Sequence, residues 1–259
     1  MEKIRTIIEN ALRIDEEDAE LVVTDVVRSE DCDLGDNFMS ESYTVTVQGT
    51  TGSGVHFKTR LFIKQLSKNS DRLATTHMGD AFHNEAFVYH KLHPLMPNIA
   101  SVTPKCFHAS EDLIVMSDLK TSGYKMLDKK KGMDFDHAQL VMKAIGKYHA
   151  GTYNIKMTFQ EKDFNSLVSE KFDFILNSNF IIYCEASIRN GIVNLKHADD
   201  VTLERAIRKL EQVLEQGDTY KLLAEYFSSP QLSLIAHGDL WLNNTLFSYD
   251  SDGKVREVK

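Results

Sequence analysis

The sequence contains few of the residues that define several common protein classes. Its 259 residues include three cysteines, four prolines and one tryptophan. The cysteines, Cys32, Cys106 and Cys184, are too few and too widely spaced for a disulfide framework or a zinc knuckle, so we expect reduced thiols and a cytoplasmic location. No apolar run reaches the roughly 18 residues of a membrane-spanning helix. The N-terminus also has no apolar signal-peptide core.

Positive charge is scarce as well. The chain has 30 Lys and Arg against 38 Asp and Glu, which gives a net charge of −8. Nucleic-acid binding needs clustered Lys and Arg, and the one basic run, residues 129–131, is typical of a solvated turn. Nucleic acid is therefore not expected as the main partner. The remaining composition, 42% hydrophobic and 26% charged, is that of a globular protein with a sizeable core.

The spacing of apolar residues predicts strands in the first part of the chain and helices in the rest. The predicted elements are a helix over 3–13, strands over 21–27, 42–49 and 55–66, a helix over 79–92, strands over 105–108 and 113–116, helices over 134–150 and 202–217, and a strand over 254–258. Residues 160–190 also have a helical pattern without clear boundaries. This order predicts a two-lobed α+β protein with lobes at 1–118 and 119–259.

Two charged residues occupy unusual positions in the first lobe. Lys64 lies at the end of strand 55–66, on the face opposite Val55, Phe57, Leu61 and Ile63. Glu85 lies on the apolar stripe of helix 79–92, where burial of an unpaired carboxylate is costly. Taken separately, Lys64 is typical of a surface lysine, and Glu85 is typical of a residue at the edge of an apolar stripe. An ion pair between the two accounts for both positions.

The segment LIAHGDLWLNNTLF, residues 234–247, carries the clearest chemical pattern. His237, Asp239 and Asn244 have the H-x-D-x-x-x-x-N spacing of kinase catalytic loops, in which Asp accepts the hydroxyl proton and Asn binds magnesium. Apolar residues on both sides predict a strand before and after the loop. A polar turn capped by Asp239 is the simpler alternative. A metal-dependent hydrolase would require further ligands at close spacing, and the sequence has none.

The same loop resembles the HGDLW-x-N-N loop of the ecdysteroid kinase-like family, also called CHK kinase-like. That family belongs with choline kinases and aminoglycoside phosphotransferases in the protein-kinase-like superfamily. Other segments resemble the family in the same order along the chain, from about residue 33 to 259: GDNFMS, FIKQL, FHNEAFVYHKLHP, LIVMSDLKTSGYKM and DHAQLVMKAIGKYHA. The resemblance implies a bilobal protein-kinase-like fold, with an antiparallel β N-lobe that contains one inserted helix and an incomplete helical C-lobe.

The resemblance also implies a function and a set of site residues. The function is ATP- and Mg²⁺-dependent phosphorylation of a hydroxyl on a small substrate, in the family typically a steroid or another lipophilic alcohol. Asp239 would orient and deprotonate that hydroxyl, His237 would brace the loop, and Asn244 would bind the metal. The implied ATP-binding residues are Lys64 and Glu85, the phosphate-covering turn of Gly35, Asn37, Phe38 and Ser40, the hinge residues Ser117 and Leu119, and Phe62 against the purine. Trp241 is equally consistent with a loop anchor and a substrate contact, and His149 is expected to be structural.

The sequence departs from the family pattern at its end. In the family, the strand after the catalytic loop leads into D-F-Q, whose Asp is the main magnesium ligand, whereas this sequence stops at Lys259 after that strand. Asp250 and Asp252 precede the strand and are not expected to replace that ligand. We therefore expect either a fragment of an ordinary kinase or a truncated form without transfer activity. In the second case the protein is a pseudokinase-like module that binds a nucleotide or a partner. The oligomeric state is not predicted.

Overall fold

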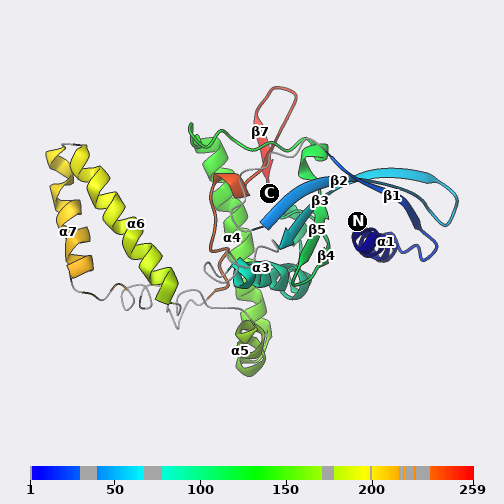
Figure 1. Cartoon of the computed structure of the whole chain (residues 1–259), viewed down its shortest axis with the longest axis horizontal. Coiled ribbons are helices and arrows are strands. Elements are labelled where there is room, and N and C mark those ends of the chain that lie inside the picture. The colour runs from blue at the N-terminus through cyan, green and yellow to red at the C-terminus, as the bar shows by residue number, and fades with distance from the viewer. Residues whose placement is uncertain are drawn as a thin grey trace. The chain divides into compact units, whose positions relative to one another are not determined.

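A computed structural model describes residues 2–29, 40–66, 78–170, 178–198, 200–215, 217, 219, 225 and 234–259 (Figure 1). The chain forms two compact units, one of Met1–Lys171 with Leu234–Lys259 and the other of Phe172–Ser233. The predicted lobe boundary between residues 118 and 119 therefore falls inside the first unit. As predicted, the fold is α+β, with an antiparallel sheet in the N-terminal part and mainly helices after it.

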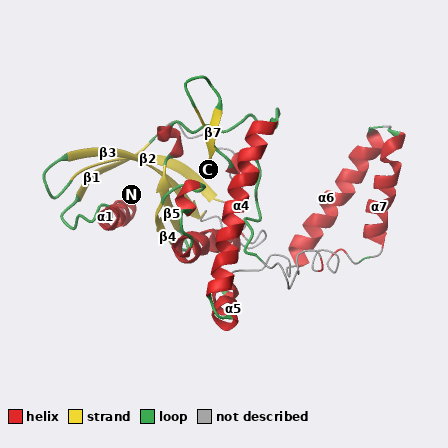
Figure 2. Ribbon diagram, turned by 180° about the vertical axis from the view of Figure 1, so that it is seen from behind, coloured by secondary structure: helices red, strands yellow, loops and turns green. Residues whose placement is uncertain are grey.

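The described part of the first unit contains a five-stranded antiparallel sheet with the order β1-β2-β3-β5-β4 (Figure 2). Its long hairpin pairs Ser40 with Leu66 at one end and Thr50 with His56 at the other. Gly54, at a φ of +83°, lies in the turn that joins these strands. The strands are β1 (Val22–Arg28), β2 (Ser40–Thr50), β3 (His56–Leu66), β4 (Cys106–Ala109) and β5 (Leu113–Ser117).

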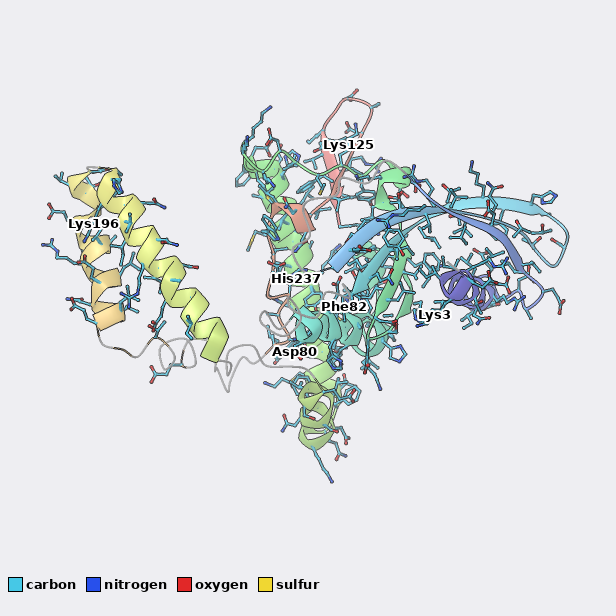
Figure 3. The ribbon with its side chains drawn as sticks, viewed as in Figure 1. Lys3, Asp80, Phe82, Lys125, Lys196 and His237 are labelled. Atoms are coloured by element: carbon cyan, nitrogen blue, oxygen red, sulfur yellow. The ribbon has the colours of Figure 1, made fainter. Side chains whose placement is uncertain are left out.

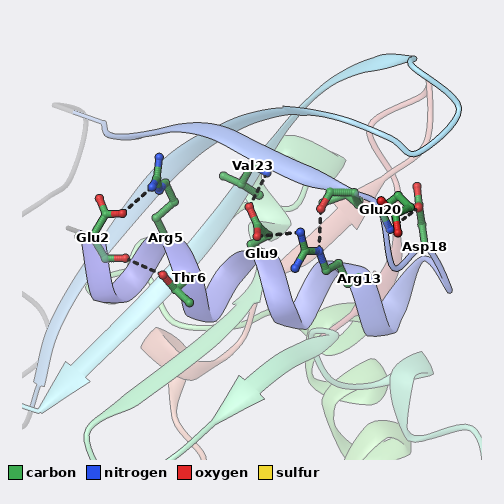
Figure 4. Close-up of polar contacts among 9 residues, drawn as sticks. Glu2, Arg5, Thr6, Glu9, Arg13, Asp18, Glu20 and Val23 are labelled. Atoms are coloured by element: carbon green, nitrogen blue, oxygen red, sulfur yellow. Dashed lines mark hydrogen bonds and ion pairs between the residues drawn. The ribbon is translucent and has the colours of Figure 1, made fainter.

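One face of this sheet packs against α1 (Glu2–Asp15). Strand alternation brings apolar side chains to this face, and they form one core with the apolar stripe of the helix. Polar contacts add to this packing, because Glu9 accepts a hydrogen bond from the Val23 backbone at 2.9 Å and Arg13 donates to the Leu21 carbonyl at 2.7 Å (Figure 4). The buried members of this core are Ile8, Leu12, Leu21, Val23, Tyr43, Val45, Val47, Leu61, Ile63, Leu113 and Val115.

The opposite face packs against α3 (Met78–Phe87), the helix inserted in the chain between β3 and β4. Phe82 and Ala86 of the helix contact Ile114 and Met116 of β5, with Phe62 of β3 packed beside them. The helix then widens into a π-helix at Val88–Leu92 and tightens into a 3₁₀ turn at His93–Leu95. The predicted helix over 79–92 thus forms, but its second half is not α-helical.

The remaining elements of the first unit form two further cores. Leu92 and Met96 pack with Tyr148, Ile155, Phe164 and Ile235, and Phe247 packs with Val141 and Val258. The second of these cores joins a helix to a two-stranded sheet. The elements are 3₁₀ turns at Ile99–Ser101, Leu119–Ser122 and Leu242–Asn244, helices α4 (Phe135–Thr158) and α5 (Glu161–Ser169), and strands β6 (Phe247–Tyr249) and β7 (Val255–Val258).

The described part of the second unit contains two helices. These are α6 (Ser178–His197) and α7 (Glu204–Glu215), the latter preceded by a 3₁₀ turn at Val201–Leu203. An ion pair between Lys196 and Glu211, with a distance of 2.6 Å, joins them. No helix in the described segments is both long and apolar enough to cross a membrane.

Three predictions about local structure are wrong. Val55 is 61% exposed, because β3 begins one residue later and the Val55 carbonyl instead closes the hairpin turn with the Thr51 amide. The predicted strand at residues 234–235 is not a strand, although Ile235 is buried. The helix predicted to end at residue 150 continues to Thr158, because burial of Thr152 and Ile155 outweighs the weak helix propensity of the last two turns.

Candidate functional site

Lys64 and Glu85 form an ion pair between the sheet and α3. The Lys64 Nζ atom donates to Glu85 Oε1 at 2.6 Å, and the two side chains are 22% and 31% exposed. Strand alternation puts Lys64 on the α3 side of the sheet, while the helix presents Glu85 next to the buried turn formed by Phe82 and Ala86. The structure therefore makes the pair that the sequence predicts. It also holds the lysine on the sheet face that carries Phe62.

The loop with the kinase spacing is a compact turn of polar contacts. The Asn244 side-chain amide donates to the Asp239 carbonyl at 2.8 Å and to Asp239 Oδ2 at 2.9 Å. The Asp239 backbone N–H donates to His237 Nδ1 at 3.3 Å, so His237 contacts the loop backbone. Gly238, between them, has a φ of +80°, a conformation that favours glycine. Asp239 and Asn244, five residues apart, are thus adjacent in space.

The ion pair and the loop lie close enough to interact electrostatically. Burial lowers the pKa of the His237 imidazole, the Asp239 and Glu85 carboxylates oppose that shift, and the Lys64 ammonium adds to it. His237 is labelled in Figure 3 at the start of the loop. One compact unit therefore brings together the sheet lysine, the helix glutamate and the loop aspartate.

The two predicted hinge residues differ in what they can offer a ligand. The Ser117 N–H donates to the Lys105 carbonyl at 2.9 Å within the sheet, and its hydroxyl accepts from the Lys105 N–H at 3.1 Å. The Leu119 carbonyl accepts from Gly123 and Tyr124 at the end of a 3₁₀ turn. The Ser117 N–H is thus engaged within the sheet, and an adenine contact from the Leu119 N–H stays a prediction.

The phosphate-covering turn is described only at its end. Ser40 begins β2 and pairs with Leu66, while Gly35, Asn37 and Phe38 lie outside the described residues. Phe62 packs with Phe82, Ile114 and Met116 on the α3 side of the sheet. Its predicted contact with a purine remains a prediction.

Further residues of the loop and of the turn after β6 differ in their surroundings. Trp241 and Leu240 are each 43% exposed in the loop. Asp250 accepts from the Asp252 and Lys254 amides at 3.0 and 2.9 Å, and so closes the turn between β6 and β7. No group of three or more His, Cys, Asp or Glu side chains within the described ranges is placed to hold a metal ion.

The chain matches the model of the ecdysteroid kinase-like family over residues 34–259. The protein belongs to the ecdysteroid kinase-like family. The matched range includes Lys64, Glu85, Asp239 and Asn244, so the kinase-like family assignment covers the whole candidate site. No curated protein and no solved structure matches the sequence.

Sequence reasoning missed two features next to the kinase-like site. A series of aromatic rings leads from the π-helical stretch after α3 to the loop, with centroid distances of 4.9 Å from Tyr89 to His93, 6.3 Å from His93 to Tyr148 and 6.5 Å from Tyr148 to His237. The helical spacing of Tyr89 and His93 was visible, but their contact with α4 was not. The second feature is a buried Asp118 paired with Arg60. Its only signal is an acid directly after an apolar strand.

Proposed function

We propose that the protein transfers the γ-phosphoryl group of ATP to a hydroxyl group of a small molecule. The observation that supports this is the placement of the Lys64–Glu85 pair and the Asp239 loop in one compact unit, where the charges of all three residues act on His237. Family membership supports a kinase-like phosphotransferase in general terms. We further propose a steroid or another lipophilic alcohol as the substrate class.

In this mechanism, the chain's own residues position the two reactants. Lys64 holds the α- and β-phosphates, and Glu85 fixes the direction of the Lys64 ammonium group. Asp239 accepts the proton of the substrate hydroxyl. The hydroxyl oxygen then bonds to the γ-phosphorus, while the bond between the γ-phosphorus and the bridging oxygen of the β-phosphate breaks and ADP leaves. His237 braces the loop through the Asp239 backbone N–H.

The loop also offers a donor that suits Mg²⁺. The Asn244 amide oxygen is the hard type of ligand that this ion prefers, and the ion usually keeps several waters and phosphate oxygens besides one or two protein ligands. Because the Asn244 amide nitrogen points to Asp239, its oxygen remains for a cation. When bound, Mg²⁺ would neutralise charge on the phosphates.

A test of the first half of the proposal is ATP binding by the 259-residue chain, measured by calorimetry with Mg²⁺. Lys64→Met removes a charged hydrogen bond to the phosphates and should weaken binding about tenfold or more. Lys58→Met is the matched control, because Lys58 lies on the same face of β3 but is exposed. Equal affinities of the two variants would contradict the proposal.

A test of the second half is transfer of labelled phosphate from ATP to a panel of lipophilic alcohols that includes steroids. Asp239→Asn should remove the transfer and leave ATP affinity nearly unchanged, because the asparagine still accepts a hydrogen bond from Asn244. ATP binding without transfer to any alcohol would favour the nucleotide-binding module instead.

A further inference from the structure

A buried ion pair joins the nucleotide-facing strand to the hinge. Arg60 Nε lies 3.2 Å from Asp118 Oδ2, and the Asp118 side chain is only 2% exposed against 34% for Arg60. The Arg60 Nη2 atom also donates to the Thr44 hydroxyl of β2 at 3.2 Å. Because a buried carboxylate is costly without a charged partner, Asp118 depends on Arg60 to stay where it is.

Asp118 in turn fixes the backbone that follows it. Its Oδ1 atom accepts from the Lys120 N–H at 3.0 Å, and its carbonyl accepts from the Thr121 hydroxyl at 2.6 Å and the Thr121 N–H at 3.1 Å. These contacts begin the 3₁₀ turn Leu119–Ser122, which ends at Gly123 with a φ of +81°. The direction of the Leu119 N–H is therefore set by the residue directly before it.

The pair lies on the same side of the sheet as the proposed ATP site, at the end away from Lys64. Arg60, Phe62 and Lys64 are alternate residues of β3 and share one face. At ~3.3 Å per strand residue, Arg60 and Lys64 are separated by about 13 Å along β3, so they serve opposite ends of an extended nucleotide. Lys64 is at the phosphate end, and Arg60 is at the base end beside Leu119.

We propose that Arg60 and Asp118 are positioning residues for the nucleotide base. The ion pair holds the hinge turn so that Leu119 can meet adenine, and it contributes to the affinity for the base but not for the triphosphate. This inference rests on the proposed ATP-dependent function. It assigns a role to Arg60, which lies outside the segments that resemble the family, and to Asp118, a hinge-segment residue to which the resemblance assigns no role.

The test compares two probes that share a triphosphate, ATP and inorganic tripolyphosphate, of which only ATP carries the adenosine group. Asp118→Asn keeps an oxygen for the Lys120 N–H but removes the charge that faces Arg60. We expect this variant to bind ATP about tenfold more weakly and to bind tripolyphosphate as the unchanged protein does. Lys64→Met, in contrast, should weaken both probes. A purely structural defect would not change the ratio of the two affinities.

A second variant keeps the proposal testable if Asp118→Asn does not fold, as judged from its unfolding transition without ligand. Arg60→Lys preserves the charge but loses the planar guanidinium group that contacts both Asp118 and Thr44, so it should show the same selective loss to a smaller degree. Unchanged ATP affinity in a folded variant, or equal weakening of both probes, would overturn the inference. If the unchanged chain binds neither probe, the proposed function itself fails.

Discussion

Replacement of Gly238 by alanine tests whether the backbone shape of the proposed catalytic loop matters, because it leaves His237, Asp239 and Asn244 in place. Gly238 lies between His237 and Asp239 at a φ of +80°, and an added Cβ would meet no atom within 4 Å. The steric cost is therefore confined to the backbone, where a left-handed conformation costs a residue with a Cβ about 1–2 kcal/mol. The free energy of unfolding should fall by no more than this amount.

The effect on function should be larger than the effect on stability. The bonds that hold the loop, from Asn244 to Asp239 and from the Asp239 N–H to His237, are exposed and contribute about 1 kcal/mol each. That is similar to the strain, so the backbone relaxes and turns the Asp239 carboxylate away from its position. We expect the rate of phosphoryl transfer to fall about tenfold or more.

Gly253 provides the matched control. It has a φ of +78° in the turn between β6 and β7, and an added Cβ there also meets nothing within 4 Å. Gly253→Ala should cost the same stability in a urea titration but leave the rate of phosphoryl transfer unchanged. Equal transfer rates for the two variants would refute the reasoning. A loss of more than about 3 kcal/mol in Gly238→Ala would also refute it, since only burial or clash produces such values.

Three further predictions concern the ion pair, a buried histidine and a buried thiol. Glu85→Gln leaves Lys64 without its anionic partner and should weaken ATP binding by about tenfold in calorimetry, whereas unchanged affinity would mean that Glu85 does not orient the lysine. Burial lowers the pKa of His93 to about 4, so on acidification the unfolded chain takes up a proton at this histidine before the folded chain does. The free energy of unfolding should therefore be highest above pH 6.5 and fall by up to about 3 kcal/mol as the pH drops from 6.5 through 4. Urea titrations at several pH values should show a smaller loss for His93→Phe, and parallel curves would contradict this cause. Burial raises the pKa of Cys106 to about 12, so iodoacetamide at pH 8 should label it far more slowly in the folded protein than in urea, as measured by mass spectrometry.

The sheet was predictable because its strands are simple two-sided patterns. Tyr43, Val45 and Val47 alternate with polar residues, and the structure buries all three against α1. The strand predicted before the proposed catalytic loop does not form. Ile235 is apolar and buried, but it packs against helices and not beside another strand. Apolar residues in a sequence indicate burial, but a strand forms only where a second strand pairs with it through backbone hydrogen bonds.

The Lys64–Glu85 part of the candidate site was predictable, because each charged residue lies at a position that calls for a partner of opposite charge. Lys64 and Glu85 each looked out of place alone, and their pairing explains both. Asp118 and Arg60 were not found, because an acid after a strand and an arginine on a strand are ordinary until the hinge places them 3.2 Å apart. Long-range contacts of this kind depend on tertiary packing, and no local spacing encodes them.

The π-helical stretch Val88–Leu92 has a consequence for how the family's sequences can change in length. It separates the part of the helix that packs beneath the sheet, at Phe82 and Ala86, from the part that packs against α4, at Leu92 and Met96. A π-helical turn takes one more residue through a full turn than an α-helical turn does, so deletion of one residue would convert the wide turn into an α-helical one and keep both sets of contacts in phase. A single-residue deletion within Val88–Leu92 should therefore be tolerated better than one within α3, where it would rotate the packed face of the helix by about 100°.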